Sequence, residues 1–188
     1  SYPGTYPYLG SFVSQAYGKE NETRLEGLVN MADVSFTEKE TSKRKSIGGI
    51  VGSTFALGEK ISVINCVNYG TVYATGPERD LANVGGIMGD SNTYNEPLLM
   101  KNCANYGAVT YVGGDGQIIT LGGIVGNVYN YVYIENCVNM GEIVPMCTSF
   151  VAANICGYAS SVGDKTKNVT TTNSFWIAGN YNDEVYGY

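Results

Sequence analysis

The chain has 188 residues, a formal net charge of −6 and no histidine. The acidic balance argues against nucleic-acid binding, and no run of 18 apolar residues exists that would form a membrane-spanning helix. Without histidine the Ser-His-Asp and Cys-His arrangements and the commonest general base are missing, and no Cys-x-x-Cys pair occurs. We therefore expect no enzyme, no metal site and no cofactor.

Residues 1–20 are expected to form an extended segment that lies outside the repeats described below. Pro3 and Pro7 exclude a helix. The segment is too apolar for a solvated tail, so we expect it to pack either as a cap on its own domain or as a strand added to a neighbouring subunit. Besides the two prolines, the side chains expected to make this contact are Tyr2, Tyr6, Tyr8, Phe12 and Val13.

Residues 21–177 are predicted to form one repeat domain, because two motifs recur about every 37 residues. The first motif is a hexad with two adjacent glycines, seen at 47–52, 84–89 and 121–126. Its glycine pairs are Gly48 and Gly49, Gly85 and Gly86, and Gly122 and Gly123. The second motif, Asn-Cys-x-Asn, begins at Asn65, Asn102 and Asn136 and is followed by Gly. Degenerate copies occur at 28–34 and at 154–174, so about four units are present.

Each unit is predicted to contain three short strands rather than helices. Gly and Asn are frequent, and the apolar runs, such as Ile47–Ser53, Ile61–Cys66 and Thr71–Thr75, are only a few residues long. Short strands repeated in phase favour an all-β fold, a parallel β-solenoid (β-helix) of about four coils of ~37 residues with extended aromatic terminal segments.

Stacked coils place equivalent residues above one another. We expect the glycine pairs to allow turns where a Cβ would clash or where φ is positive, and Ile50, Ile87 and Ile124 to point into the core. Asn ladders are expected to form hydrogen bonds along the coil axis. A phosphate-binding role for the hexad is disfavoured, because no helix follows the glycines.

The five cysteines divide into two groups. Cys66, Cys103 and Cys137 occupy equivalent positions, where neighbouring Cβ atoms would be about 4.8 Å apart, farther than a relaxed disulfide prefers. Buried thiols are therefore expected, with a strained bridge between two of them as the alternative. Cys147 and Cys156 lie nine residues apart in the last unit, and a disulfide between them remains open.

Charged residues and sequons give weaker signals. The cluster Lys39, Lys43, Arg44 and Lys45 is interpreted as a solvated loop. Asp90, Asp115 and Glu142 fall at different phases of the repeat and predict no acidic site, and 113–116 is interpreted as a turn rather than a calcium loop. Two sequons, at Asn21 and Asn168, are candidate glycosylation sites.

The hexad followed by the Asn-Cys-x-Asn-x-Gly segment resembles the GLUG motif over residues 47–143, and more loosely over 25–46 and 144–177. Asn173–Trp176 is similar to the Asn-Cys-Tyr-Trp that often follows the last such repeat. The resemblance implies an architecture shared with large extracellular surface proteins, including the non-catalytic parts of immunoglobulin A proteases. It implies no catalytic residue, and it implies an extracellular or cell-surface location.

We therefore expect a processed, extracellular structural protein that assembles head to tail with copies of itself into a surface filament. Covalent glycans are expected as further partners. The aromatic tail at 178–188 is expected to complement the N-terminal segment. The alternative is an adhesin-like or glycan-binding module of a larger surface protein, and a third interpretation is a carbohydrate-active β-helix enzyme.

Overall fold

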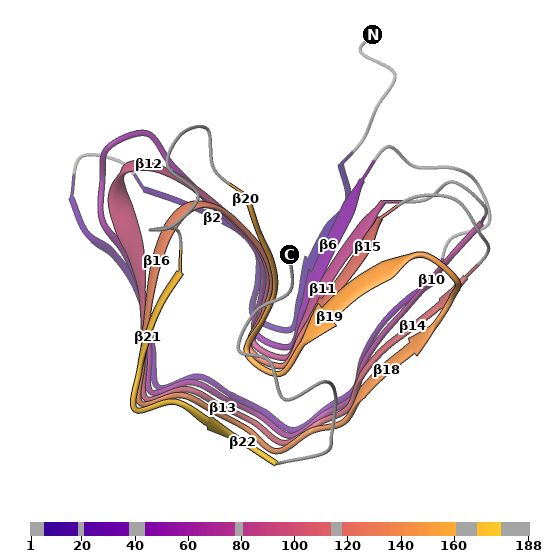
Figure 1. Cartoon of the computed structure of the whole chain (residues 1–188). Coiled ribbons are helices and arrows are strands. Elements are labelled where there is room, and N and C mark those ends of the chain that lie inside the picture. The colour runs from indigo at the N-terminus through magenta and orange to yellow at the C-terminus, as the bar shows by residue number, and fades with distance from the viewer. Residues whose placement is uncertain are drawn as a thin grey trace, which may run out of the picture.

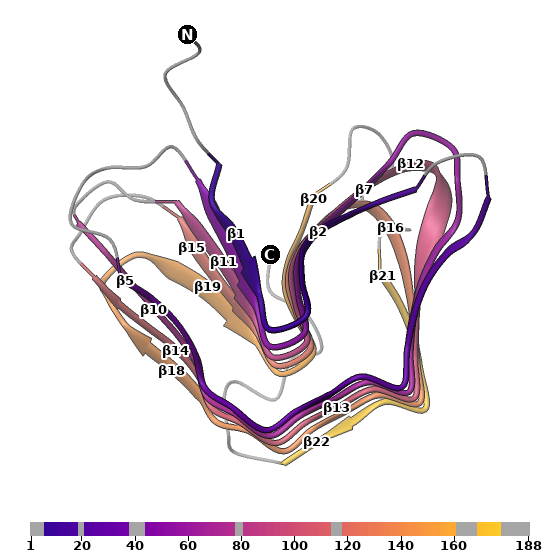
Figure 2. The ribbon, with the colours of Figure 1, turned by 180° about the vertical axis from the view of Figure 1, so that it is seen from behind.

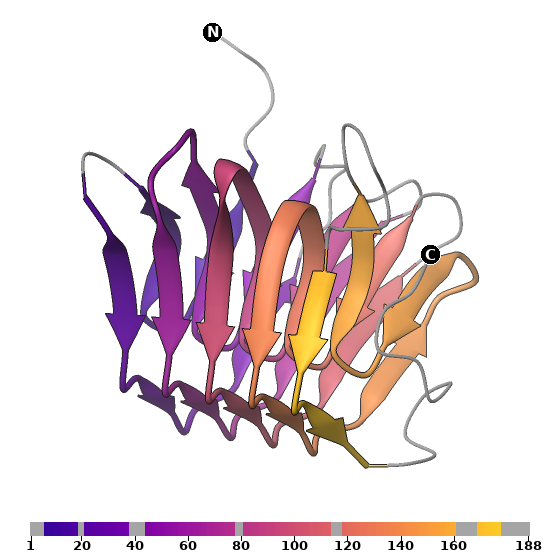
Figure 3. The ribbon, with the colours of Figure 1, turned by 60° about the vertical axis from the view of Figure 1, so that its left-hand side comes forward.

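The computed structural model describes residues 6–18, 21–37, 44–77, 81–113, 118–160 and 169–177. These residues form a parallel β-solenoid of about four turns, which confirms the predicted fold class. Successive coils lie side by side in chain order, from indigo to yellow (Figure 3). Within these ranges the structure contains no helix with the length and apolar character of a membrane span.

Four parallel sheets run along the solenoid, and every strand pairs with its equivalent in a neighbouring coil. Sheet 1 consists of β1 (Tyr8–Gly10), β6 (Lys45–Gly48), β11 (Ala82–Gly85), β15 (Ile119–Gly122) and β19 (Phe150–Ala153). Sheet 2 consists of β2 (Val13–Tyr17), β7 (Val51–Ala56), β12 (Met88–Lys101), β16 (Val125–Glu135) and β20 (Cys156–Ser160). It is extended by β3 (Thr23–Glu26), β8 (Ile61–Ile64) and β21 (Val169–Thr172).

The other two sheets complete each coil. Sheet 3 consists of β4 (Val29–Asn30), β9 (Val67–Asn68), β13 (Ala104–Asn105), β17 (Val138–Asn139) and β22 (Phe175–Trp176). Sheet 4 consists of β5 (Val34–Thr37), β10 (Val72–Gly76), β14 (Val109–Gly113) and β18 (Ile143–Met146). Viewed along the stack, each coil traces two lobes that meet at the glycine pair (Figure 1).

The apolar core has two parts, one in each lobe. Core 1 fills the lobe that sheet 2 encloses. It contains the isoleucines of the hexads, Ile50, Ile87 and Ile124, which are all fully buried. Core 2 lies between sheets 1 and 4, and contains Ile47 and Tyr111. The predicted strand Ile47–Ser53 is in fact two strands, β6 and β7, because the chain turns at the glycine pair and passes from one lobe to the other.

The N-terminal segment belongs to the solenoid rather than lying outside it. Tyr8, Leu9 and Gly10 pair in register with Ser46, Ile47 and Gly48, and β2 continues in register with β7. In Figure 2, β1 and β2 follow the same path as the equivalent strands of the later coils. The structural boundary therefore precedes residue 20, because these residues supply the first rung of sheets 1 and 2. Tyr2, Pro3 and the tail at 178–188 lie outside the described residues.

Candidate functional site

The second position of each glycine pair has no room for a side chain, because an Asn side chain from the second motif of the same coil packs against it. A Cβ on Gly86 would lie 2.2 Å from the Gly123 oxygen and 2.3 Å from the Asn105 Cγ. Gly49 and Gly123 make equivalent contacts with Asn68 and Asn139. No positive φ is found at the hexad glycines among the described residues, so close approach alone excludes a side chain there.

The positive φ values occur instead along the exposed Asn ladder. Asn65, Asn102 and Asn136 have φ of 54°, 54° and 52°. Asn tolerates this left-handed region better than most residues, which explains its recurrence at this corner. The Asn102 Nδ2 donates to the Asn65 Oδ1 (3.0 Å), and the Asn136 Nδ2 donates to the Asn102 Oδ1 (3.2 Å).

A second, buried Asn ladder passes through Asn30, Asn68, Asn105 and Asn139. Each of the first three Nδ2 atoms donates to the Oδ1 of the next coil, at 2.7 Å, 2.9 Å and 2.9 Å. The same Nδ2 atoms also donate to the carbonyl two residues ahead, for example from Asn105 to Gly107 at 2.8 Å. The four amides of this buried ladder are thereby paired along the axis.

The ladder cysteines Cys66, Cys103 and Cys137 are buried thiols. Each thiol donates to the carbonyl two residues earlier, for example from Cys103 to Lys101 at 3.4 Å. Ser174 occupies the next position, and its Oγ accepts the Cys137 N–H at 3.3 Å. Hydrogen bonds to the Cys137 and Cys66 sulfurs, together with burial, raise the pKa of the Cys103 thiol.

The disulfide considered between Cys147 and Cys156 is not formed. Cys156 belongs to core 1, where burial raises the pKa of its thiol to about 12, whereas Cys147 packs against core 2. The two side chains therefore lie in different lobes.

Asn21 is exposed, and Asn168 lies outside the described residues. Arg44 and Lys45 are not solvated, which corrects the interpretation of that cluster. The Lys45 Nζ donates to the Thr75 oxygen at 3.1 Å and lies 5.2 Å from the Phe36 ring centre. Lys39, Lys43 and Asp115 lie outside the described part of the chain, and Glu142 is exposed.

A pocket of about 210 Å³, here called the inter-sheet pocket, lies where sheets 1 and 2 face each other. At the base of the two lobes the sheets approach closely, since a Cβ on Gly48 would lie 2.8 Å from the Gly89 nitrogen. The residues that line the inter-sheet pocket are Tyr6, Tyr8, Gln15, Arg44, Ser53, Phe55, Asp90 and Asn92.

Arg44 connects the two walls of the inter-sheet pocket. Its Nη2 lies 3.3 Å from the Asp90 Oδ1 on β12, and its guanidinium carbon lies 4.4 Å from the Tyr129 ring centre. One orientation of the Asn83 amide satisfies both Arg44 and Thr120. In this orientation the Asn83 Oδ1 accepts from the Arg44 Nε and Nη2, both at 3.0 Å, and the Asn83 Nδ2 donates to the Thr120 Oγ1 at 2.8 Å. Asn83 and Thr120 belong to sheet 1, so the guanidinium bridges the sheets.

Asp90 is 5% exposed, and burial raises the pKa of its carboxyl to about 6, although Arg44 and Asn127 oppose the shift. The Asn127 Nδ2 donates to the Asp90 Oδ1 at 3.1 Å. Sequence reasoning missed this group, because Arg44 and Asp90 are 46 residues apart and fall at different phases of the repeat. No group of three or more metal-binding side chains is found in the described part of the chain.

Comparison with known proteins gives a fold but no family. No protein-family profile and no curated protein sequence matches the chain. Among solved structures it is similar to a candidate immunoglobulin A1 protease from Bacteroides ovatus, with a TM-score of 0.50 and 16% sequence identity. The match covers 85% of this chain and 57% of that chain. At this identity the likeness shows a shared β-solenoid fold, and the GLUG assignment stays a prediction.

Proposed function

We propose that this chain is a non-catalytic structural module of an extracellular surface protein, and that its coils continue from one copy into the next to form a filament. The observation that carries the proposal is the pair of unlike, open ends. Sheet 3 begins at β4 and ends at β22, and within the described ranges neither strand has a partner on its outer edge. Unpaired strand edges favour the addition of further strands.

The two ends have matching geometry. Because the coils stack in parallel and in register, β4 of one copy placed beyond β22 of another would continue sheet 3 without a change of direction. Contact between unlike faces repeats indefinitely and therefore produces a filament rather than a closed dimer. The extracellular location is proposed from the GLUG resemblance, and the solved structure adds only the shared solenoid fold.

The peptide groups of β4 suggest a specific test. The Val67 N–H donates to the Leu28 oxygen (2.8 Å), and the Tyr69 N–H donates to the Asn30 oxygen (2.9 Å). Since successive residues of a parallel strand face opposite neighbours, the Val29 N–H faces the open edge. Val29→Pro removes this donor without removing a hydrogen bond to β9.

Electron microscopy and sedimentation velocity over a concentration series would compare the native chain with Val29→Pro and with Val29→Thr, which keeps the N–H. We expect filaments from the native chain and Val29→Thr, and monomers with an unchanged circular dichroism spectrum from Val29→Pro. A native chain that remains monomeric throughout the series would refute filament formation, as would unimpaired filaments of Val29→Pro.

A further inference from the structure

We propose that the inter-sheet pocket is a binding site for a single hydroxyl-rich sugar ring of a neutral glycan. This inference does not depend on filament formation, since the pocket lies in the first coils of one chain and is lined only by residues of that chain. Its volume of about 210 Å³ is below the ~300–1,000 Å³ of pockets for drug-sized ligands, so it suits one ring.

The charges of the inter-sheet pocket favour a neutral ligand. The Arg44 guanidinium is neutralised by the Asp90 carboxylate, with the side chain of Arg44 only 24% exposed and that of Asp90 only 7%. A bound anion would compete with Asp90 for the guanidinium, and a bound cation would be repelled by it. The pair instead presents fixed polar atoms that a neutral ligand with hydroxyl groups satisfies.

Two amide oxygens near this pair lack a hydrogen-bond donor. Neither the Asn92 Oδ1 nor the Asn127 Oδ1 has a partner among the described residues, although both atoms are buried. Asn92 lines the inter-sheet pocket, whereas Asn127 is 1% exposed and donates to Asp90 from behind the lining. A buried acceptor without a partner is costly, so the oxygen of the lining residue Asn92 favours a ligand that donates hydrogen bonds.

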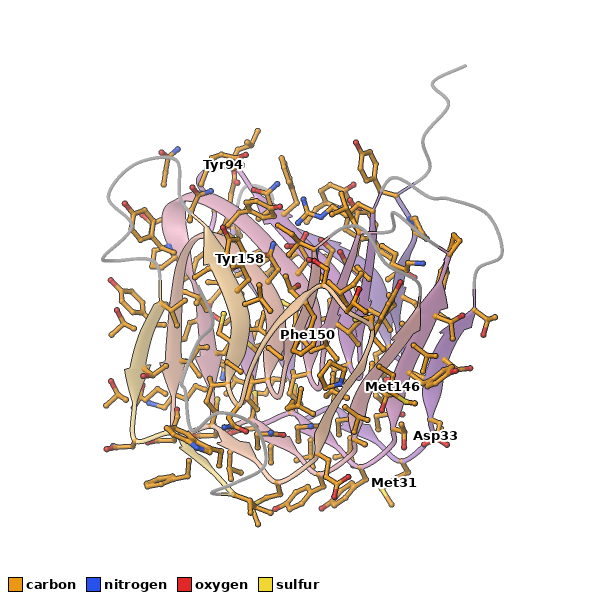
Figure 4. The ribbon with its side chains drawn as sticks, turned by 45° about the vertical axis from the view of Figure 1, so that its right-hand side comes forward. Met31, Asp33, Tyr94, Met146, Phe150 and Tyr158 are labelled. Atoms are coloured by element: carbon orange, nitrogen blue, oxygen red, sulfur yellow. The ribbon has the colours of Figure 1, made fainter. Side chains whose placement is uncertain are left out.

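Aromatic rings form part of the lining of the inter-sheet pocket. Tyr6 and Phe55 line it, and Tyr6 is 52% exposed. Phe55 is flanked by Tyr17 and Tyr94, with ring centres 6.0 Å and 6.3 Å away. Figure 4 shows Tyr94 at the upper edge of the molecule. These aromatic lining residues give the apolar C–H face of a sugar a surface to stack on, while the amide and charged groups form hydrogen bonds with its hydroxyls.

The test uses the whole chain and saturation-transfer NMR with galactose, mannose, glucose and N-acetylglucosamine, each also as a short oligomer. Three variants are compared: Asn92→Ala and Tyr6→Ala inside the site, and Tyr106→Ala as a matched exposed tyrosine just after β13, 46% exposed. At least one sugar should bind the native chain and Tyr106→Ala equally. Tyr6→Ala should weaken binding about fivefold, from the loss of roughly 1 kcal/mol of stacking.

Asn92→Ala should weaken binding without lowering the melting temperature, because its Oδ1 has no partner to lose in the unliganded chain. Inorganic phosphate and Ca²⁺ are tested in parallel as charged probes. The proposal is overturned if none of the eight probe sugars binds, if Tyr106→Ala weakens binding as much as Tyr6→Ala, or if phosphate or Ca²⁺ occupies the site in preference to the sugars.

Discussion

The contact between the second hexad glycine and the buried Asn ladder predicts a large effect for one added methyl group. In Gly86→Ala the new Cβ would lie 2.2 Å from the Gly123 oxygen and 2.3 Å from the Asn105 Cγ. Real Cβ atoms do not approach so closely, so the coils must separate or the amide must move. The φ of Gly86 is not positive, and the cost is therefore steric rather than conformational.

The magnitude follows from what the amide loses when it moves. Asn105 donates to Gly107 and to Asn139, at 2.8 Å and 2.9 Å, and accepts from Asn68 at 2.9 Å. Three buried hydrogen bonds contribute about 1 kcal/mol each. Overpacking against a rigid backbone adds about 1–3 kcal/mol. We therefore expect Gly86→Ala to lower the free energy of unfolding by about 4–6 kcal/mol, a large part of the total for a domain.

Urea unfolding followed by circular dichroism measures this difference. The matched control is Gly58→Ala, whose Cβ would meet only the Asn95 Nδ2 at 3.9 Å, and which should change stability by less than about 1 kcal/mol. Gly86→Ala should also cost less in an Asn105→Ala background, because the two changes act on one contact. Equal stability of the two glycine variants, or full additivity with Asn105→Ala, would refute the reasoning.

Three further predictions concern titratable groups. The folded-state pKa of Asp90, about 6 against an ordinary value of 3.8, should add up to about 3 kcal/mol of stability that is complete below pH 4 and lost as pH rises through 6. Urea titrations across pH should show this loss in the native chain and not in Asp90→Asn. The Cys103 sulfur accepts a hydrogen bond from the Cys66 N–H. Cys103→Ser should therefore be more stable than Cys103→Val in thermal melts, because a hydroxyl still accepts this bond, whereas Val leaves the N–H unpaired. Iodoacetamide followed by mass spectrometry of the native fold should label Cys147 well before Cys156, and resistance of both until reduction would instead reveal a disulfide.

The sequence was sufficient to predict the solenoid, because the fold repeats the same contacts at the same interval. The hexads at 47–52, 84–89 and 121–126 recur in step with the sheet register, and a fixed period has few other structural explanations. The first rung was missed because Leu9 and Gly10 are followed by Ser11, not by a second glycine. The offset of 38 residues between Gly10 and Gly48 was the available signal.

The charged groups of the inter-sheet pocket could not be predicted from the period. Arg44 lies before the hexad at 47–52, and Asp90 follows the hexad at 84–89. Their spacing of 46 residues is not repeated by an equivalent pair in the other coils. Three-dimensional proximity came from the turn at the glycine pair, which folds sheet 2 back beside sheet 1. A sequence shows which residues share a ladder, but not which ladders face each other across a turn.

The two kinds of ladder have different consequences for function. A ladder that holds coils together must repeat, because each amide or isoleucine has to match its neighbour. The ladder of sheet 2 that faces the inter-sheet pocket does not repeat: it reads Gln15, Ser53, Asp90, Asn127 and Tyr158. Its members are aligned as strictly as those of the core, yet each coil supplies a different chemical group. Recognition in such a fold therefore depends on positions that depart from the repeat while keeping its register.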